Sequence, residues 1–124
     1  KDCSSLVSIS IPQNVHSIGS RCFEGCSALK EIKIPTNVNK IGEFFCFGCK
    51  SLSLVSFPQN LKSIGRNAFE GCISLSQISF PCNLKSIGKN VFSGCSSLTK
   101  VTIPSSIKSL NLGMDPKTLI VFSR

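Results

Sequence analysis

The chain has 124 residues, a hydrophobic fraction of 41% and a formal net charge of +8 at pH 7, from 14 Lys and Arg against six Asp and Glu. This length and hydrophobic content suffice for a folded domain and exclude a wholly disordered chain. No apolar run approaches the roughly 20 residues of a membrane-spanning helix. One histidine and six scattered acids leave few groups for acid–base or zinc chemistry.

The chain is built from an internal repeat with a period of 23 residues. Segments of the form C-x-x-L begin at Cys3, Cys26, Cys49, Cys72 and Cys95. A leucine, a proline and two glycines recur in the same phase in most copies. Residues 1–124 are therefore expected to form a single solenoid of five coils, with a C-terminal cap at about 111–124. The complete first copy predicts either a fragment of a longer array or a first coil without a cap.

Each copy predicts the same elements in the same order. The segment 6–11 has the alternation of a short strand and ends at Pro12, which lacks a backbone donor. An asparagine two residues later is expected to bond the backbone of its own turn and of the next, forming a ladder. A tight bend at Gly19 and one helical or 3-10 turn, as in 66–69, complete the coil. The positions of the ladder are Asn14, Asn37, Asn60 and Asn83, with Ser106 in the fifth copy.

One such copy cannot bury its own apolar side, but stacked copies can. Coils stacked about 4.8 Å apart form a curved solenoid with a parallel sheet on one face and Leu, Ile, Val, Phe and Cys inside. In the second copy, Glu43-Phe44-Phe45-Cys46-Phe47 places cysteine where phenylalanine is expected, so Phe45 or Phe47 is predicted to fill that slot. The segment 119–122 is predicted to be a final edge strand.

The pattern C-x-x-L-x-x-I-x-I-P-x-x-V-x-x-I-G-x-x-A-F-x-G over residues 3–110 resembles the BspA-like, or Treponema-type, class of leucine-rich repeats. This resemblance implies an α/β leucine-rich-repeat solenoid, with a parallel β-sheet on the concave face and short turns or 3-10 helix on the convex face. It also implies a cell-surface or secreted protein of bacteria or protists that adheres to host proteins or cells.

The outward positions of the strands are the predicted partner-binding surface, because repeat proteins bind ligands on extended concave faces. A solvated sheet face without a ligand is the alternative, and the absence of Trp and Tyr removes the commonest interface anchors. Two rows make up this surface: Ser8, Glu31, Leu54, Gln77 and Lys100, followed by Ser10, Lys33, Ser56, Ser79 and Thr102.

A second candidate surface is a basic row in one phase of the repeat, formed by His16, Lys62, Lys85 and Lys108. Such a row attracts sulfated glycans, anionic lipid headgroups or nucleic acid, although it could serve solubility alone. Nucleic acid is disfavoured because the row has no aromatic stacking partner. A third hypothesis is a structural spacer between functional domains of a longer chain.

The eight cysteines allow either a disulfide framework or a buried column of thiols. Five of them share one phase, and parallel side chains do not favour disulfide geometry, so free buried thiols are expected there. The redox state of Cys22, Cys46 and Cys82 is left open. No metal set, cofactor motif or catalytic constellation is identified, so the sequence predicts a non-enzymatic protein that does not insert into a membrane.

Overall fold

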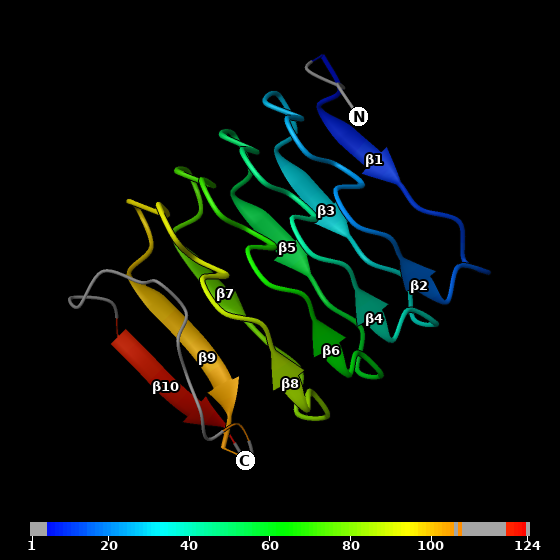
Figure 1. The fold of residues 1–124 in the computed structure, drawn as a ribbon, viewed down its shortest axis with the longest axis vertical. Coiled ribbons are helices and arrows are strands. Elements are labelled where there is room, and N and C mark those ends of the chain that lie inside the picture. Colours follow the sequence, from blue (N-terminus) through cyan, green and yellow to red (C-terminus); the bar gives the residue numbers. More distant parts are fainter. Residues whose placement is uncertain (1–4, 106, 108–118, 124) are drawn as a thin grey trace.

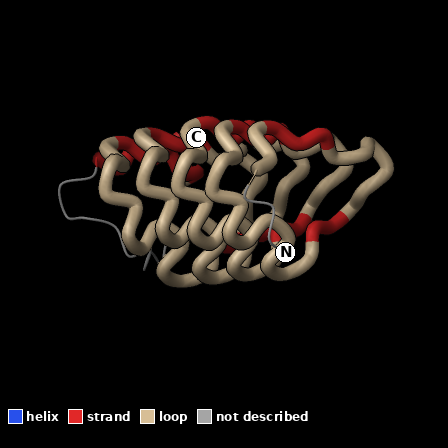
Figure 2. Tube along the Cα trace, turned by 90° about the horizontal axis from the view of Figure 1, so that it is seen from above, coloured by secondary structure: helices blue, strands red, loops and turns tan. Residues whose placement is uncertain are grey.

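The computed structural model describes residues 5–105, 107 and 119–123, and in them the chain winds as a β-solenoid whose coils stack side by side (Figure 1, Figure 2). The strands of the first row are β1 (Ser8–Ser10), β3 (Glu31–Lys33), β5 (Leu54–Ser56), β7 (Gln77–Ser79) and β9 (Lys100–Pro104). Those of the second row are β2 (Ser17–Ile18), β4 (Lys40–Ile41), β6 (Ser63–Ile64) and β8 (Ser86–Ile87).

Strand pairing is parallel, and the paired residues of successive coils are 23 positions apart. Ser8 pairs with Glu31, and Glu31 pairs with Leu54. The same register relates Gln77 to Lys100. The sequence period is therefore one full coil, and residues of one phase form straight rows along the stack. The predicted solenoid with a parallel sheet is confirmed.

The first row is divided into two sheets between β5 and β7, in the orders β1-β3-β5 and β10-β9-β7, where β10 is Leu119–Ser123. At this junction Phe57 and Phe80 occupy a slot that holds isoleucine at Ile11, Ile34 and Ile103. Their ring centroids are 5.2 Å apart. Two adjacent coils thus both carry a phenylalanine in this slot at the junction where the ladder is interrupted.

One feature of the coil differs from the sequence-based expectation. The second-row strands form a sheet of their own in the order β2-β4-β6-β8, which was not predicted because two residues are too short to display an alternating pattern. Of the two expected alternatives, short turns or 3-10 helix, the segment before each recurring glycine forms turns, and no 3-10 helix occurs among the described residues. The predicted final strand is confirmed as β10 (Leu119–Ser123), parallel to β9.

The core is a set of columns, of which the phenylalanine column is the bulkiest. Phe45 packs edge-on between Phe23 and Phe69, with ring centroids 5.4 and 5.9 Å away. It has no exposed surface, so the prediction that Phe45 or Phe47 fills this slot is confirmed for Phe45. Cys46 beside it is equally buried. The large and small side chains of this pair are exchanged relative to Ala68-Phe69, which preserves the packed volume.

Backbone contacts and amide side chains join one coil to the next. A Cβ added to Gly42 would lie 2.6 Å from the backbone carbon of Gly19, so this slot admits no side chain once coils have stacked. The predicted asparagine ladder is confirmed for Asn37, Asn60 and Asn83, and Ser106 lies outside the described residues. Asn37 donates from Nδ2 to the Gln13 carbonyl at 3.1 Å, and Asn83 donates to the Gln59 carbonyl at 3.0 Å. Each amide replaces bonds to water with a bond to the preceding coil.

Within the described residues, no helix has the length and apolar character needed to cross a membrane.

Candidate functional site

The two predicted ligand rows lie on the outer side of the first-row strands, which we call the first-sheet face. Nine of the ten residues are exposed and Thr102 is half-buried. Their neighbours inside the strands point into the core, and Ile32 and Val101 are at most 1% exposed. The alternation of the strand thus separates a core side from a solvent side, as the sequence pattern indicated.

Two shallow hollows open on the first-sheet face, one on each side of Leu54. The first has a volume of about 170 Å³ and is lined by residues that include Glu31, Lys33 and Ser56. The second, of about 340 Å³, lies over the junction of β5 and β7 and is lined by residues that include Gln77 and Lys100. The predicted rows therefore form a contoured surface with charged and polar groups around its apolar centre.

Leu54 is the apolar centre of this face. It is 54% exposed and borders both hollows. Val55 behind it is also partly exposed, whereas the equivalent Ile32 and Ile78 are buried. The interrupted ladder between β5 and β7 thus leaves more apolar surface at the middle of the face than at either side.

The basic row is also aligned, by backbone hydrogen bonds from one coil to the next. The amide of Asn39 donates to the His16 carbonyl, that of Lys62 to the Asn39 carbonyl, and that of Lys85 to the Lys62 carbonyl, at 2.9, 2.9 and 2.8 Å. His16, Lys62 and Lys85 are exposed. Lys108 lies outside the described residues.

Three further cations belong to the same side and were missed in the sequence: Lys40, Arg66 and Lys89. Lys40 and Arg66 line a hollow of about 440 Å³, together with Ser20, Ser63 and the glycines of the bend. Lys89 follows Arg66 in the next coil, since the Asn67 amide donates to the Lys89 carbonyl at 3.0 Å. These cations carry no repeat signal because serine or glutamate fills their slots in other coils.

The cysteine column is largely composed of free thiols. Cys49, Cys72 and Cys95 are buried and unbridged. Each Sγ donates to a carbonyl 26 residues upstream, in the preceding coil, at 3.2, 3.3 and 3.1 Å. Burial raises the pKa of Cys72 strongly and that of Cys95 to about 11. Cys72 and Cys95 are accordingly protonated structural groups at neutral pH.

Cys26 departs from this expectation because it is disulfide-bonded, so the prediction of a free thiol at this position is wrong. Cys3 lies outside the described residues. Cys22 and Cys82, whose state the sequence left open, are free and exposed.

Cys46 and Cys49 form a C-x-x-C pair that the sequence interpretation missed. The spacing is visible in Cys46-Phe47-Gly48-Cys49, but each cysteine was assigned separately to a repeat slot. The Cys49 amide donates to the Cys46 carbonyl at 3.1 Å, and both side chains are fully buried. Burial raises the pKa of Cys46, whereas its hydrogen bond to Cys49 lowers the pKa of Cys49.

A cation–aromatic cluster, also unpredicted, lies on the turns that follow the second sheet. The guanidinium carbons of Arg21 and Arg66 lie 4.3 and 5.4 Å from the centroid of the Phe44 ring. Arg21 and Phe44 have positive φ values of 59° and 55°, in a slot that holds asparagine at Asn67 and Asn90. Asparagine tolerates this left-handed conformation better than arginine or phenylalanine, so the stacking offsets backbone strain.

No catalytic arrangement is found among the described residues. They include no buried polar or charged side chain and no group of three or more His, Cys, Asp or Glu placed to hold a metal ion. His16 is exposed, and within the described part of the chain its side chain forms no ion pair with a carboxylate.

The coil geometry, the parallel first-row strands and the columns of leucine define a leucine-rich-repeat solenoid. The family model described as the BspA type leucine rich repeat region matches residues 1–114 in six copies. The chain therefore belongs to the BspA-type leucine-rich-repeat family, as the repeat pattern had indicated.

Solved structures of similar fold support this assignment. The chain is 28% identical to a leucine rich cell surface protein of Faecalibacterium prausnitzii A2-165, with a TM-score of 0.85 over 95% of this chain and 32% of that one. It is 30% identical to the leucine rich repeat protein of T. pallidum, with a TM-score of 0.79 over 94% and 52% of the two chains. It is 28% identical to the pneumococcal vaccine antigen PcpA, with a TM-score of 0.77 over 95% and 31%.

The chain thus spans between about a third and a half of these solved chains. No curated protein matches it. It is a repeat domain related to leucine-rich surface proteins and to a pneumococcal antigen, in a family whose members generally act as binding modules without enzymatic activity.

Proposed function

We propose that this chain is a non-enzymatic protein-binding module at a microbial cell surface, and that it binds a host extracellular or cell-surface protein through the first-sheet face. The observation that carries the proposal is Leu54, which is 54% exposed between two hollows lined by charged and polar side chains. The cell-surface setting is supported by the relative from F. prausnitzii, which is described as a leucine rich cell surface protein.

The arrangement around Leu54 fits the anatomy of a protein interface. Interfaces concentrate binding energy in a few central side chains that become fully buried, and a polar rim excludes water around them. Here Leu54 supplies the apolar centre, and Glu31, Lys33, Gln77 and Lys100 supply the rim. Both signs of charge occur in the rim, so the face would align a partner by complementary charge as well as by contact.

Leu54→Arg tests the centre of the proposed interface. The binding of individual purified extracellular proteins to the immobilised chain would be measured by surface plasmon resonance. For each protein that binds, Leu54→Arg is expected to weaken binding at least about tenfold, because loss of a central contact costs more than about 1.4 kcal/mol. The matched control is Ile73→Arg, since Ile73 is 45% exposed and lies outside the first-sheet face. Equal binding by the wild type and Leu54→Arg would contradict the proposal.

The charges of the rim are tested by a double reversal, Lys33→Glu with Lys100→Glu. We expect slower association and weaker binding, with a smaller dependence on salt, because rim charges act mainly by steering the encounter. The double variant Lys62→Glu and Lys85→Glu has the same net charge and serves as its control. If all partners bind both variants like the wild type at every salt concentration, the chain would be better described as a structural spacer.

A further inference from the structure

The cations of the described residues gather on one side of the solenoid, which is not the side of the first-sheet face. Of the ten described Lys and Arg residues, five lie in the segments 16–20, 39–43, 62–66 and 85–89, each of which contains a second-row strand with one residue before it and two after it. Of the four described acids, one lies there, Glu43. The five cations are Lys40, Lys62, Arg66, Lys85 and Lys89. This segregation concentrates positive potential along one side of the molecule.

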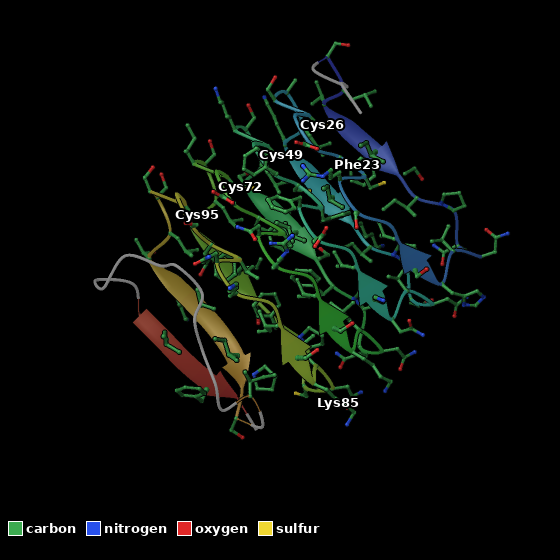
Figure 3. The ribbon with its side chains drawn as sticks, in the orientation of Figure 1. Phe23, Cys26, Cys49, Cys72, Lys85 and Cys95 are labelled. Atoms are coloured by element: carbon green, nitrogen blue, oxygen red, sulfur yellow. The ribbon has the colours of Figure 1, made fainter. Side chains whose placement is uncertain are left out.

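Four of the five cations form two short rows along the stacking direction, whereas the slot of Lys40 holds serine in both neighbouring coils. Lys62 and Lys85 occupy the same slot of adjacent coils, joined by the 2.8 Å hydrogen bond of their backbones. Arg66 and Lys89 likewise share one slot. Because adjacent coils are about 4.8 Å apart, charges are repeated at that interval along a line. Figure 3 shows Lys85 at the outer edge of the molecule beside β8.

A groove accompanies these rows. The hollow of about 440 Å³ spans β4 and β6 and is lined by Lys40, Arg66 and the hydroxyl groups of Ser20 and Ser63. Gly42 and Gly65 also line it, in a slot where the stacked backbones leave no room for a Cβ. The groove is therefore lined by backbone at Gly42 and Gly65 and by side chains at the other positions named.

The one acid in the groove is already neutralised. Glu43 accepts a hydrogen bond from Nε of Arg66 at 2.9 Å, and the Arg66 side chain is still 53% exposed. Lys40, Lys62, Lys85 and Lys89 form no ion pair among the described residues. Four exposed ammonium groups thus have no protein counter-ion on this side.

We propose that this side of the solenoid binds a linear sulfated glycan along the direction of coil stacking. A chain with regularly repeated anionic groups matches cations that are themselves repeated along a line, and the serine hydroxyls offer further donors to sulfate or sugar oxygens. No aromatic side chain lines the groove for stacking a nucleotide base.

Heparin is the probe for this proposal, measured by surface plasmon resonance at physiological salt and over a salt series. Two variants of the cations in and beside the groove, called the groove variants, are used: Lys62→Glu with Lys85→Glu, and Lys40→Glu with Lys89→Glu. Each is expected to weaken heparin binding at least about tenfold and to reduce the slope of log affinity against log salt. The control, Lys33→Glu with Lys100→Glu, has the same net charge on the first-sheet face and is expected to change binding less than about threefold. Its distance from the groove leaves only screened, long-range interactions.

Three results would overturn the proposal. The first is that the wild type does not bind heparin. The second is that the groove variants and the control weaken heparin binding equally, because that would indicate a response to net charge alone. The third is that a single-stranded oligonucleotide or vesicles containing phosphatidylserine bind the chain more tightly than heparin does, and that the groove variants weaken this binding as strongly. None of these results bears on the first-sheet face, because protein binding there is tested by different variants.

Discussion

The stacking of coils is tested most directly by one substitution made at two equivalent glycines. A Cβ on Gly65 would meet the backbone nitrogen of Glu43 far inside the 3.0 Å that Cβ atoms keep from other heavy atoms, whereas a Cβ on Gly19 meets nothing within 4 Å. Neither glycine has a positive φ. The change Gly→Ala is chemically identical at both positions, so any difference in stability reports contact with the preceding coil.

The expected loss of stability depends on which atoms must move to make room for the added Cβ. Overpacking a close-packed interior costs about 1–3 kcal/mol, and more where the obstacle cannot rotate away. The atoms that obstruct Gly65→Ala belong to the backbone of Gly42 and Glu43, so we expect a cost of about 3 kcal/mol or more. Gly19→Ala is expected to be neutral or stabilising by up to about 1 kcal/mol, because alanine restricts the unfolded chain.

Urea denaturation followed by far-UV circular dichroism is the appropriate assay, since the chain has no Trp or Tyr for fluorescence. Gly65→Ala should lower the midpoint strongly and Gly19→Ala should leave it near that of the wild type. If Gly65→Ala does not fold, Gly42→Ala provides a second comparison, with its obstruction at 2.6 Å. Equal midpoints for Gly65→Ala and the wild type, or equal losses at Gly19 and Gly65, would refute this account of coil stacking.

Three further predictions concern the ladder and the thiols. Asn83→Ala removes the 3.0 Å bond to the Gln59 carbonyl and should lower the free energy of unfolding by about 1 kcal/mol, whereas an unchanged urea midpoint would contradict a stabilising ladder. The pKa of Cys95 is raised from 9.0 to about 11, so the unfolded thiol ionises first as pH rises, and about 1.4 kcal/mol of stability should be lost between neutral pH and pH 10. Cys95→Ala should lack this component, and identical alkaline profiles would exclude it. Iodoacetamide should modify the exposed Cys22 and Cys82 in the native protein and the buried free cysteines only after denaturation, as mass spectrometry would register; rapid native labelling of the latter would contradict their burial. Those cysteines are Cys46, Cys49, Cys72 and Cys95.

The sequence alone determined the parts of the structure that repeat. The period of 23 residues fixes the parallel register, because stacking equivalent coils places each residue opposite the one a period away. The positions of the asparagine ladder and of the exposed rows on the first-sheet face follow from the same argument. The class of protein was also predictable, since the recurring Cys, Leu, Pro and Gly slots are those of the BspA-type pattern.

Only the tertiary structure decided the features in which neighbouring coils differ. Phe57 and Phe80 meet across one junction, and the ladder between β5 and β7 is interrupted there, with Leu54 exposed above it. The Cys46–Cys49 pair and the stacking of Arg21 and Arg66 on Phe44 likewise involve residues that depart from the repeat.

The basic side of the solenoid has the same origin, because Lys40 replaces a recurring serine, and Arg66 and Lys89 occupy a slot that holds serine or glutamate in the preceding coils. A periodic pattern specifies the average coil, since every copy must stack on its neighbours in the same way. The contacts between two particular coils depend on which side chains meet at that junction, and this is settled only when the chain is folded.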